Sequence, residues 1–315
     1  MSIDDILNRK IVVSVITCTY NRANTLEKAY ESLCKQTFKK FEWIVSDDGS
    51  TDDTRQLVEK WISDNIITIV YLYQTNNGKH IAANSARNIA KGYFDIGLDS
   101  DDFMREDALE VFINAWKSIP FESWKDFYAV KARCFNPINN QPIGKNIPNS
   151  RLICHYLDAK YKMKIQNEMW SMSRLEVTKE FPYPNIMGGK NNGGLRFYPE
   201  GIGQDLASRK YFILLINDAL RGYTINDSTS LMGRGKKYDR SKENIYMWIH
   251  IVNDNFDYFW YDPMSFLKAI IGCSMDSFFL KLKIKKMLQS INSISKKIIV
   301  LLFVPFGFIA YLIKR

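Results

Sequence analysis

The stretch around which the rest of the chain can be interpreted is Gly97-Leu98-Asp99-Ser100-Asp101-Asp102-Phe103. It follows a short apolar run at 93–96, which predicts a buried strand, and it precedes a helix predicted over 105–116. Three carboxylates within four residues repel one another by about 1 kcal/mol or more per pair. A divalent cation such as Mg²⁺ or Mn²⁺ would relieve that repulsion, because both ions prefer oxygen ligands. The alternative is a solvated acidic loop that starts a helix.

The composition is that of a folded globular protein. The 315 residues can form one large α/β domain with an appendage, or two small domains. Cysteines are scattered without paired spacing, which predicts neither a zinc site nor a disulfide framework and favours a reducing compartment. The acidic start, Met1-Ser-Ile-Asp-Asp5, has no apolar segment, so we expect no secretory signal.

The positive charge of the chain is concentrated at its C-terminal end. Residues 281–315 hold eight basic side chains and no acidic ones, whereas the whole chain carries +9, so residues 1–280 carry only +1. A nearly neutral body argues against nucleic acid as a partner. The basic end instead predicts contact with an anionic surface.

Strands and helices alternate along the first hundred residues. The predicted strands are 11–17, 41–45, 67–73 and 93–96, and the predicted helices between them are 24–35, 52–62 and 81–90. This repeat predicts an α/β fold with a mostly parallel sheet and helices on both faces. Ligands of such sheets bind at the carboxyl ends of the strands, where the polar loops 19–22, 47–50, 76–79 and 99–102 fall. None of these loops carries a dinucleotide-binding or Walker-type pattern.

Four motifs in this region carry a family resemblance. They are Ser14-Val-Ile-Thr-Cys-Thr-Tyr-Asn-Arg22, the run from Gln36 to Asp52 that contains Ser46-Asp-Asp-Gly-Ser-Thr-Asp52, Asn77-Gly78 with Ala86-Arg-Asn88, and Leu98-Asp-Ser-Asp-Asp102. In this order and spacing they resemble family 2 glycosyltransferases, inverting enzymes with the GT-A fold. The resemblance covers roughly residues 11–120. It implies a UDP-sugar donor bound together with Mn²⁺ or Mg²⁺.

The resemblance also implies roles for particular residues. Those that would contact the donor nucleotide or its phosphates are Thr19, Tyr20, Arg22, Asp48, Lys79, Arg87 and Asp99. Asp48 would accept a hydrogen bond from the base, and the ring of Tyr20 would lie against it. Asp99 and Asp101 form the DXD motif of the family, in which we expect Asp101 to bind the metal and Asp99 to contact the ribose. Asp102 is the alternative metal ligand.

The second half offers a general base. Pro199-Glu-Gly-Ile-Gly-Gln-Asp-Leu206 resembles the family segment in which an aspartate takes the proton from the acceptor hydroxyl, which makes Asp205 the predicted catalytic residue. Gln204 stands where the family usually has glutamate. Glu200 is the reserve candidate, Glu168 a weaker one, and Asp205 could instead cap its helix.

Other elements of this half are predicted from local pattern. Strands are expected at 127–135 and 169–172, a helix over 206–220 and a last strand over 221–226. The Gly/Asn/Pro-rich run 181–194 predicts a flap over the acceptor side, and Gly233-Arg-Gly-Lys-Lys237 is either a phosphate contact or a solvated turn. Helices are expected at about 241–260 and 264–290.

The tail predicts a membrane contact. Lys296 and Lys297 precede the apolar run 298–313, which contains Pro305 and Gly307 and is followed by Lys314-Arg315. A spanning helix needs about 20 apolar residues, so an interfacial or shallow anchor on the anionic cytoplasmic leaflet fits better. The alternative is a helix packed against the body or against a second copy.

Together these patterns predict a cytoplasmic, membrane-associated glycosyltransferase in surface-polysaccharide assembly. It is expected to transfer one sugar from a UDP-sugar to a hydroxyl of a saccharide acceptor that is linked to a lipid. The expected domains are a GT-A catalytic domain at 1–235 (donor half about 1–120, acceptor half about 121–235), a helical extension at 236–295 and a membrane-associating tail at 296–315. The rivals are a nucleotidyltransferase and a non-catalytic subunit that binds a nucleotide-sugar.

Overall fold

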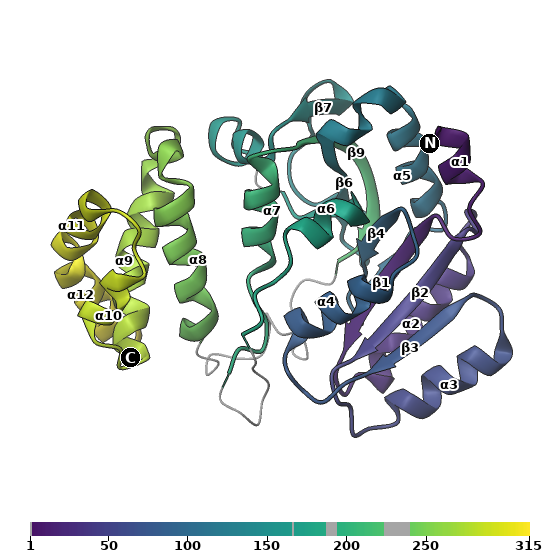
Figure 1. Ribbon diagram of the computed structural model, residues 1–315, viewed down its shortest axis with the longest axis horizontal. Coiled ribbons are helices and arrows are strands. Elements are labelled where there is room, and N and C mark those ends of the chain that lie inside the picture. Colours follow the sequence, from purple (N-terminus) through teal and green to yellow (C-terminus); the bar gives the residue numbers. More distant parts are fainter. Residues whose placement is uncertain (1, 166, 187–193, 224–239) are drawn as a thin grey trace.

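A computed structural model describes residues 2–165, 167–186, 194–223 and 240–315. One mixed sheet forms the body, in the order β3-β2-β1-β4-β8-β6-β9-β5, with β7 paired to β9 (Figure 1). The strands are β1 (Val13–Thr19), β2 (Phe41–Asp47), β3 (Ile69–Tyr73), β4 (Phe94–Gly97), β5 (Phe103–Met104), β6 (Phe127–Phe135), β7 (Arg151–Cys154), β8 (Met169–Arg174) and β9 (Phe212–Gly222).

The predicted donor half is the parallel part of this sheet. β1 pairs in parallel with β2 and with β4, and β2 pairs in parallel with β3. The helices of this part of the chain are α1 (Ile3–Leu7), α2 (Ala23–Cys34), α3 (Thr54–Asp64), α4 (Lys79–Ile89) and α5 (Ala108–Lys117), with the 3₁₀ turn η1 (Phe121–Asp126). The predicted alternation of strands and helices is confirmed, and parallel pairing brings the polar loops to one edge.

Alternation along β1 explains the layers. Val15 points to the main core, which also holds Trp43 and Leu26 of α2, whereas Ile16 points to the opposite face and packs with Ala86 of α4. Successive side chains of a strand point to opposite faces of the sheet. A strand that is covered on both faces therefore needs apolar residues at consecutive positions, as β1 has. Helices therefore cover both faces of the sheet, as the sequence predicts.

The acceptor half is mostly antiparallel. β8 joins the two halves, because it pairs antiparallel with both β4 and β6. β9 pairs in parallel with β6 and antiparallel with β5 and β7. Short elements here are η2 (Pro148–Ser150), the π-helical turn η3 (Asp158–Lys162), α6 (Leu175–Glu180) and α7 (Glu200–Ser208).

One prediction in this half is wrong. The helix expected over 206–220 is in fact the end of α7 followed by the strand β9. The strand expected over 221–226 overlaps β9 at 221–222, and its residues 224–226 lie outside the described residues. The run Phe212-Ile-Leu-Leu-Ile216 has no helical polar face, and a short apolar run of this kind is compatible with either element. Its position inside the sheet, with residues 213–216 buried next to β6, selects the strand.

The C-terminal helices gather at one end of the molecule, beyond α7 (Figure 1). They are α8 (Ser241–Asp254), η4 (Phe256–Tyr261), α9 (Pro263–Phe279), α10 (Ile284–Gln289), α11 (Ile294–Leu302) and α12 (Val304–Lys314). The helix expected over 264–290 is divided into α9 and α10. These helices have a core of their own, to which Leu157 and Tyr161 of the body also belong.

The apolar tail is packed against α9. Phe308 and Tyr311 of α12 contact the ring of Phe278, and Gly307 lies directly against Ser274. Within the described ranges no single helix is long and apolar enough to cross a membrane. α11 and α12 reach that length and composition only as a pair, and the pair is bent by 49°.

Candidate functional site

Two cations hold the acidic loop that follows β4. Lys79 Nζ lies 2.8 Å from Asp99 Oδ1 and 2.8 Å from Glu200 Oε1. Burial opposes the charge of Lys79, but the two carboxylates outweigh it and raise its pKa well above the usual value. The same lysine is the main cause that lowers the pKa of Asp99 to about 2. Asp99 is therefore ionised, and the start of α4 is tied to the start of α7.

The second cation is Arg221 of β9. Its Nη2 lies 2.9 Å from Glu168 Oε1, its Nε 3.5 Å from Asp102 Oδ2 and its Nη1 3.8 Å from Asp99 Oδ2. The side chain is 8% exposed, so these carboxylates hold a buried charge. Sequence reasoning did not assign a role to Arg221. The available signal was the basic residue that follows Ala219-Leu220, near the end of β9.

Asp48 organises the neighbouring loop. Its carboxylate accepts hydrogen bonds from Gln74 Nε2 (2.8 Å) and from the backbone N–H groups of Asn77 (2.9 Å) and Gly78 (2.8 Å). Gly78 has φ +102°, and a Cβ there would lie 2.7 Å from the carbonyl oxygen of Leu195, so glycine is required. Asp48 thus fixes the turn that presents Lys79, and burial raises the pKa of its carboxyl group.

The loop after β1 lies beside this turn. The backbone N–H of Asp48 donates to the carbonyl of Thr19 at 2.8 Å. The hydroxyl of Thr19 is buried and has no hydrogen-bond partner among the described residues. Tyr20 is half-buried and Arg22 is 9% exposed. The positive charge of Arg22 also contributes to lowering the pKa of Asp99, after Lys79 and Arg221, which places Arg22 near the acidic loop.

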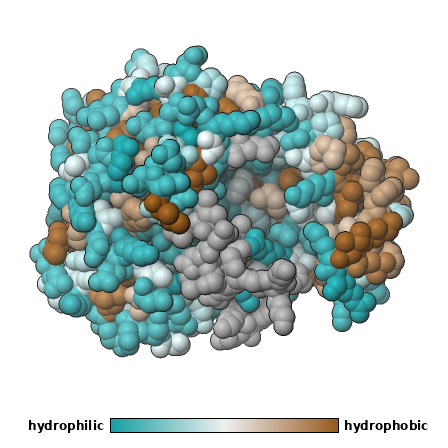
Figure 2. All heavy atoms as spheres, turned by 180° about the vertical axis from the view of Figure 1, so that it is seen from behind, coloured by the Kyte–Doolittle hydropathy of each residue, from teal (hydrophilic) through white to brown (hydrophobic). Residues whose placement is uncertain are grey.

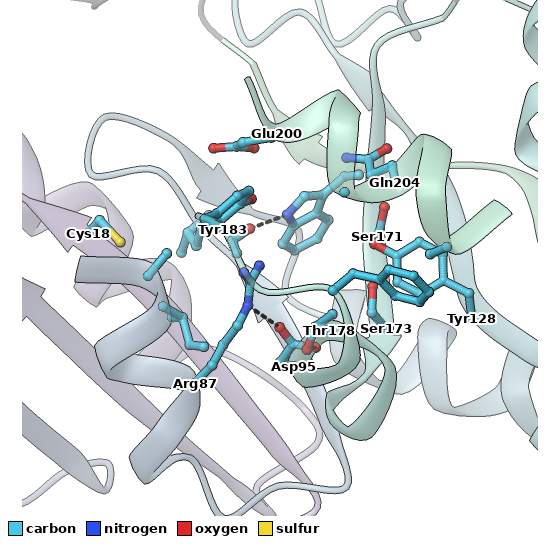
Figure 3. A pocket seen from close by; sticks show the side chains of 18 of the residues that line it. Cys18, Arg87, Asp95, Tyr128, Ser171, Ser173, Thr178, Tyr183, Glu200 and Gln204 are labelled. Carbon is cyan, nitrogen blue, oxygen red and sulfur yellow. Dashed lines mark hydrogen bonds and ion pairs between the residues drawn. The ribbon is translucent and has the colours of Figure 1, made fainter. Parts of the chain in front are cut away.

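A cavity of about 230 Å³ opens beside the acidic loop. Its walls come from β1, α4, β4, β8, α6, α7 and the end of β9, and they include Lys79, Asp99, Glu168, Glu200 and Arg221. Figure 3 shows this pocket, with Glu200 and Gln204 on α7 facing Tyr183 and Arg87. The pocket therefore joins the donor half to the acceptor half.

Arg87 lies in the wall of this pocket, but it has protein partners. Its Nε is 3.3 Å from Asp95 Oδ2, and its guanidinium lies 4.9 Å from the centre of the Tyr183 ring (Figure 3). Burial raises the pKa of Asp95, partly offset by the charge of Arg87. Asn84 of the same helix binds both backbone groups of Tyr183. Arg87 and Asn84 thus fix the segment that leads away from α6.

Asp205 is not among the residues that line the pocket. Its carboxylate is fully buried and accepts from Lys160 Nζ (3.0 Å), from Asn255 Nδ2 (2.8 Å) and, at 3.3 Å, from His250 Nε2. Burial would raise the pKa of Asp205, but His250 and Lys160 outweigh it and hold the pKa below its usual value. In this arrangement Asp205 joins α7 to η3 and α8, and the residue that faces the pocket is Gln204.

The predicted site residues therefore fall into four groups. Lys79, Arg87 and Asp99 line the pocket. Arg22, Asp101 and Asp102 belong to or lie near the acidic loop, and Thr19, Tyr20 and Asp48 lie at the ends of the adjacent strands β1 and β2. Asp205 lies behind the pocket wall. Residues 187–193 of the predicted flap and the segment 233–237 lie outside the described residues.

The acidic loop suits a cation that shares its ligands with a substrate. Within the described ranges no three His, Cys, Asp or Glu side chains converge on a metal position. Mg²⁺ is commonly held by one or two carboxylates together with substrate phosphates, and the acidic loop has carboxylates of this kind. Asp102 is paired with Arg221, whereas burial and the charge of Asp99 raise the pKa of Asp101. A cation beside Asp101 would stabilise its ionised form against burial and the charge of Asp99.

Comparison with protein families matches residues 14–154 to the family described as glycosyl transferase family 2. Over these residues, which are less than half of the chain, it is similar to this glycosyltransferase family. A segment is 35% identical over 108 residues to hyaluronan synthase of Pasteurella multocida, covering 34% of this chain and 11% of that protein. Another is 41% identical over 92 residues to WfaP of Escherichia coli, a UDP-Glc:alpha-D-GlcNAc-diphosphoundecaprenol beta-1,3-glucosyltransferase, covering 29% and 36%. The match thus spans well under half the length of these two relatives.

Solved structures show the same fold over nearly the whole chain. TarS of S. aureus in complex with UDP-GlcNAc superposes with a TM-score of 0.58 at 20% identity and covers 90% of this chain and 82% of that one. The mannosyltransferase PcManGT of Pyrobaculum calidifontis, in complex with GDP-Man and Mn²⁺, gives a TM-score of 0.52 at 18% identity, covering 98% and 86%. The predicted GT-A-type fold with a helical C-terminal region is confirmed.

Proposed function

We propose that this protein transfers a single sugar, with inversion, from a UDP-sugar to a hydroxyl of a saccharide acceptor. The pocket that joins the acidic loop to α7 supports this proposal most. A donor and an acceptor must lie next to each other for transfer, and this pocket lies between the two halves predicted to bind them. The names of relatives support the donor class: TarS is described with UDP-GlcNAc and WfaP acts on UDP-Glc. The hydroxyl of Thr19, buried without a partner among the described residues, is available to the nucleotide.

The charges of the pocket support a role for a divalent cation. Its three described cations, Lys79, Arg87 and Arg221, are each paired with carboxylates. The four described carboxylates of the lining are Asp95, Asp99, Glu168 and Glu200. A diphosphate would meet a slight excess of negative charge there. Bound Mn²⁺ or Mg²⁺, with Asp101 as the proposed ligand and Asp102 as the alternative, would stabilise the charge of the leaving diphosphate.

The general base is proposed to come from α7. Inversion requires one group that accepts the proton of the attacking hydroxyl. This helix carries Glu200, whose side chain is 53% exposed in the pocket, and Asp205, which the family resemblance favours but which is enclosed behind Gln204. Glu200 already lies 2.8 Å from Lys79, so a ligand that engages Lys79 would release the carboxylate toward the acceptor.

The acceptor is proposed to be a lipid-linked saccharide at the cytoplasmic face of a membrane. The outer side of α11 and α12 exposes a row of large apolar side chains, seen in Figure 2 as an apolar area at the end of the molecule. The row consists of Ile294, Ile298, Leu301, Leu302, Phe306, Phe308, Ile309, Leu312 and Ile313. Basic residues, Lys296, Lys297 and Lys314, occur on the same two helices, which is the charge pattern that anionic lipids attract.

Turnover tests this proposal. The full chain is incubated with UDP-sugars, a lipid-linked or free saccharide acceptor and Mn²⁺, and both UDP release and the extended saccharide are measured. We expect both products, with dependence on the cation. Donor binding without product would instead support a non-catalytic subunit, and release of pyrophosphate would support a nucleotidyltransferase.

A further inference from the structure

A buried lysine lies directly behind the pocket wall. Lys131 of β6 is 1% exposed, and its Nζ donates to Gln204 Oε1 at 2.7 Å and to Ser171 Oγ at 2.9 Å. The ammonium also lies 4.5 Å from the centre of the Tyr156 ring. Both of its hydrogen-bond acceptors, Gln204 on α7 and Ser171 on β8, line the pocket.

This contact fixes the orientation of the Gln204 amide. An ammonium group only donates hydrogen bonds, so the side-chain oxygen of Gln204 must face Lys131 and its NH₂ group must face away. Figure 3 shows the amide nitrogen of Gln204 on the side toward Glu200, with Ser171 on the same wall. Because Ser171 Oγ accepts from the same ammonium, the hydroxyl proton of Ser171 also points away from Lys131.

We propose that Gln204 and Ser171, oriented by Lys131, form a pair of hydrogen-bond donors that recognises the acetamido carbonyl of an N-acetylated donor sugar. This inference rests on the proposed function and names the substrate class of the same pocket. A glutamate at position 204 would instead accept from Lys131 with one oxygen and present a second acceptor to the sugar. The glutamine found here therefore changes the polarity of this wall from acceptor to donor.

The charges of the pocket favour a neutral ligand group over a carboxylate. Glu200 lies one turn before Gln204 on α7, and Glu168 lies in the same lining. A uronate carboxylate would be placed near both, whereas an acetamido carbonyl accepts the same two hydrogen bonds without a charge. A plain hydroxyl at this position would gain less, because it is a weaker acceptor than an amide carbonyl.

The test compares donors that differ only at this group. For the full chain, kcat/KM for UDP release and the thermal shift on binding are measured with UDP-GlcNAc, UDP-Glc and UDP-GlcA, and with UDP-GalNAc and UDP-Gal. We expect the wild type to prefer the N-acetylated member of one pair by about tenfold or more, the size of one lost hydrogen bond to a buried partner. Gln204→Met should remove most of that preference, because it lowers kcat/KM for the N-acetylated donor more than for the plain donor.

Lys131 is a positioning residue, so its variants test the mechanism of the preference. Lys131→Met should reduce the same preference although Lys131 does not touch the sugar, and Lys131→Arg, which is also donor-only, should restore part of it. Gln56→Met, at an exposed position of α3, is the matched control and should change nothing. A wild type that prefers the plain sugar or the uronate, or a preference unchanged in Gln204→Met, overturns the inference. Failure to bind or turn over any of the donors would contradict the proposed function itself.

Discussion

Arg221 and Asp102 face each other across the edge of the sheet, with 3.5 Å between Nε and Oδ2, and both are nearly buried. The arginine ends β9 and the aspartate ends the acidic loop after β4, so their pairing fixes the acceptor half to the donor half at the pocket. Glu168 extends the contact on the other side of the guanidinium.

We expect Arg221→Met to lower the free energy of unfolding by about 3–5 kcal/mol, because it leaves Asp102 buried without its cation. Urea unfolding followed by fluorescence measures this. Combining it with Asp102→Asn should recover part of the loss. Lys210→Met, which breaks an exposed ion pair with Glu180, is the control and should cost at most about 1 kcal/mol. Equal losses for Arg221 and Lys210 would contradict the role assigned to this pair.

The two carboxylates of α7 should behave differently when neutralised. Asp205→Asn breaks the buried contact with Lys160 and His250, so we expect a loss of about 3 kcal/mol in stability and faster amide exchange in α8. Glu200→Gln loses only a half-exposed contact and should leave stability within about 1 kcal/mol.

Activity then assigns the base. If Glu200 is the base, kcat falls by about 100-fold or more in Glu200→Gln, while Asp205→Asn remains active at a temperature at which it is folded. The opposite result would show that the enclosure of Asp205 opens when the acceptor binds. Glu168→Gln, at the weaker candidate for the base, is measured in the same way.

Asp101→Asn should weaken Mn²⁺ binding in the presence of UDP by about tenfold or more. The protein would contribute only one or two carboxylate ligands beside the UDP phosphates, so the loss of one of them is large. Isothermal titration with Mn²⁺ at saturating UDP measures it, and removal of the cation with a chelator should abolish turnover. Asp102→Asn should affect stability more than cation affinity, since Asp102 is paired with Arg221. Reversed effects would make Asp102 the ligand.

The pH dependence of stability should report Lys131. Burial lowers its pKa to about 8, below the value of 10.5 of the unfolded chain, with the charges of Asp205 and Glu168 acting in the opposite direction. Between these values the unfolded state binds more protons, so stability rises with pH. This side chain alone contributes a rise of about 1.4 kcal/mol from pH 7 to pH 9. The difference between wild type and Lys131→Met in urea unfolding should show that rise, and a flat difference would place the titration elsewhere.

Membrane binding should depend on the exposed row of α11 and α12. Replacing Leu302 and Ile313, which are 67% and 80% exposed, by glutamate should abolish co-sedimentation with vesicles rich in phosphatidylglycerol without unfolding the protein. Ile66→Glu, at a 63% exposed position of the body, is the matched control. Binding that survives the double substitution, or equal binding to neutral vesicles at high salt, would contradict the proposed anchor.

Whether the sequence predicts a contact between two side chains depends on whether a local pattern already places their elements together. Lys79 and Asp99 could be expected to meet because both follow strands of one parallel sheet. Arg221 and Lys131 could not, since their carboxylate and amide partners come from strands and helices far apart in the chain. The enclosure of Asp205 has the same origin, because His250 lies on α8 and Asn255 directly after it, and no local pattern encodes how this helix docks.

Gly307 leaves no room for a side chain between α12 and α9: a Cβ there would come within 1.9 Å of Ser274 Oγ. The apolar end of the chain is consequently held against α9 and is not a flexible tether. A bilayer that binds the exposed row of α11 and α12 would hold the pocket at a set height and tilt above the lipid headgroups. The distance between the lipid surface and α7 would then set the length of the acceptor that can reach the pocket.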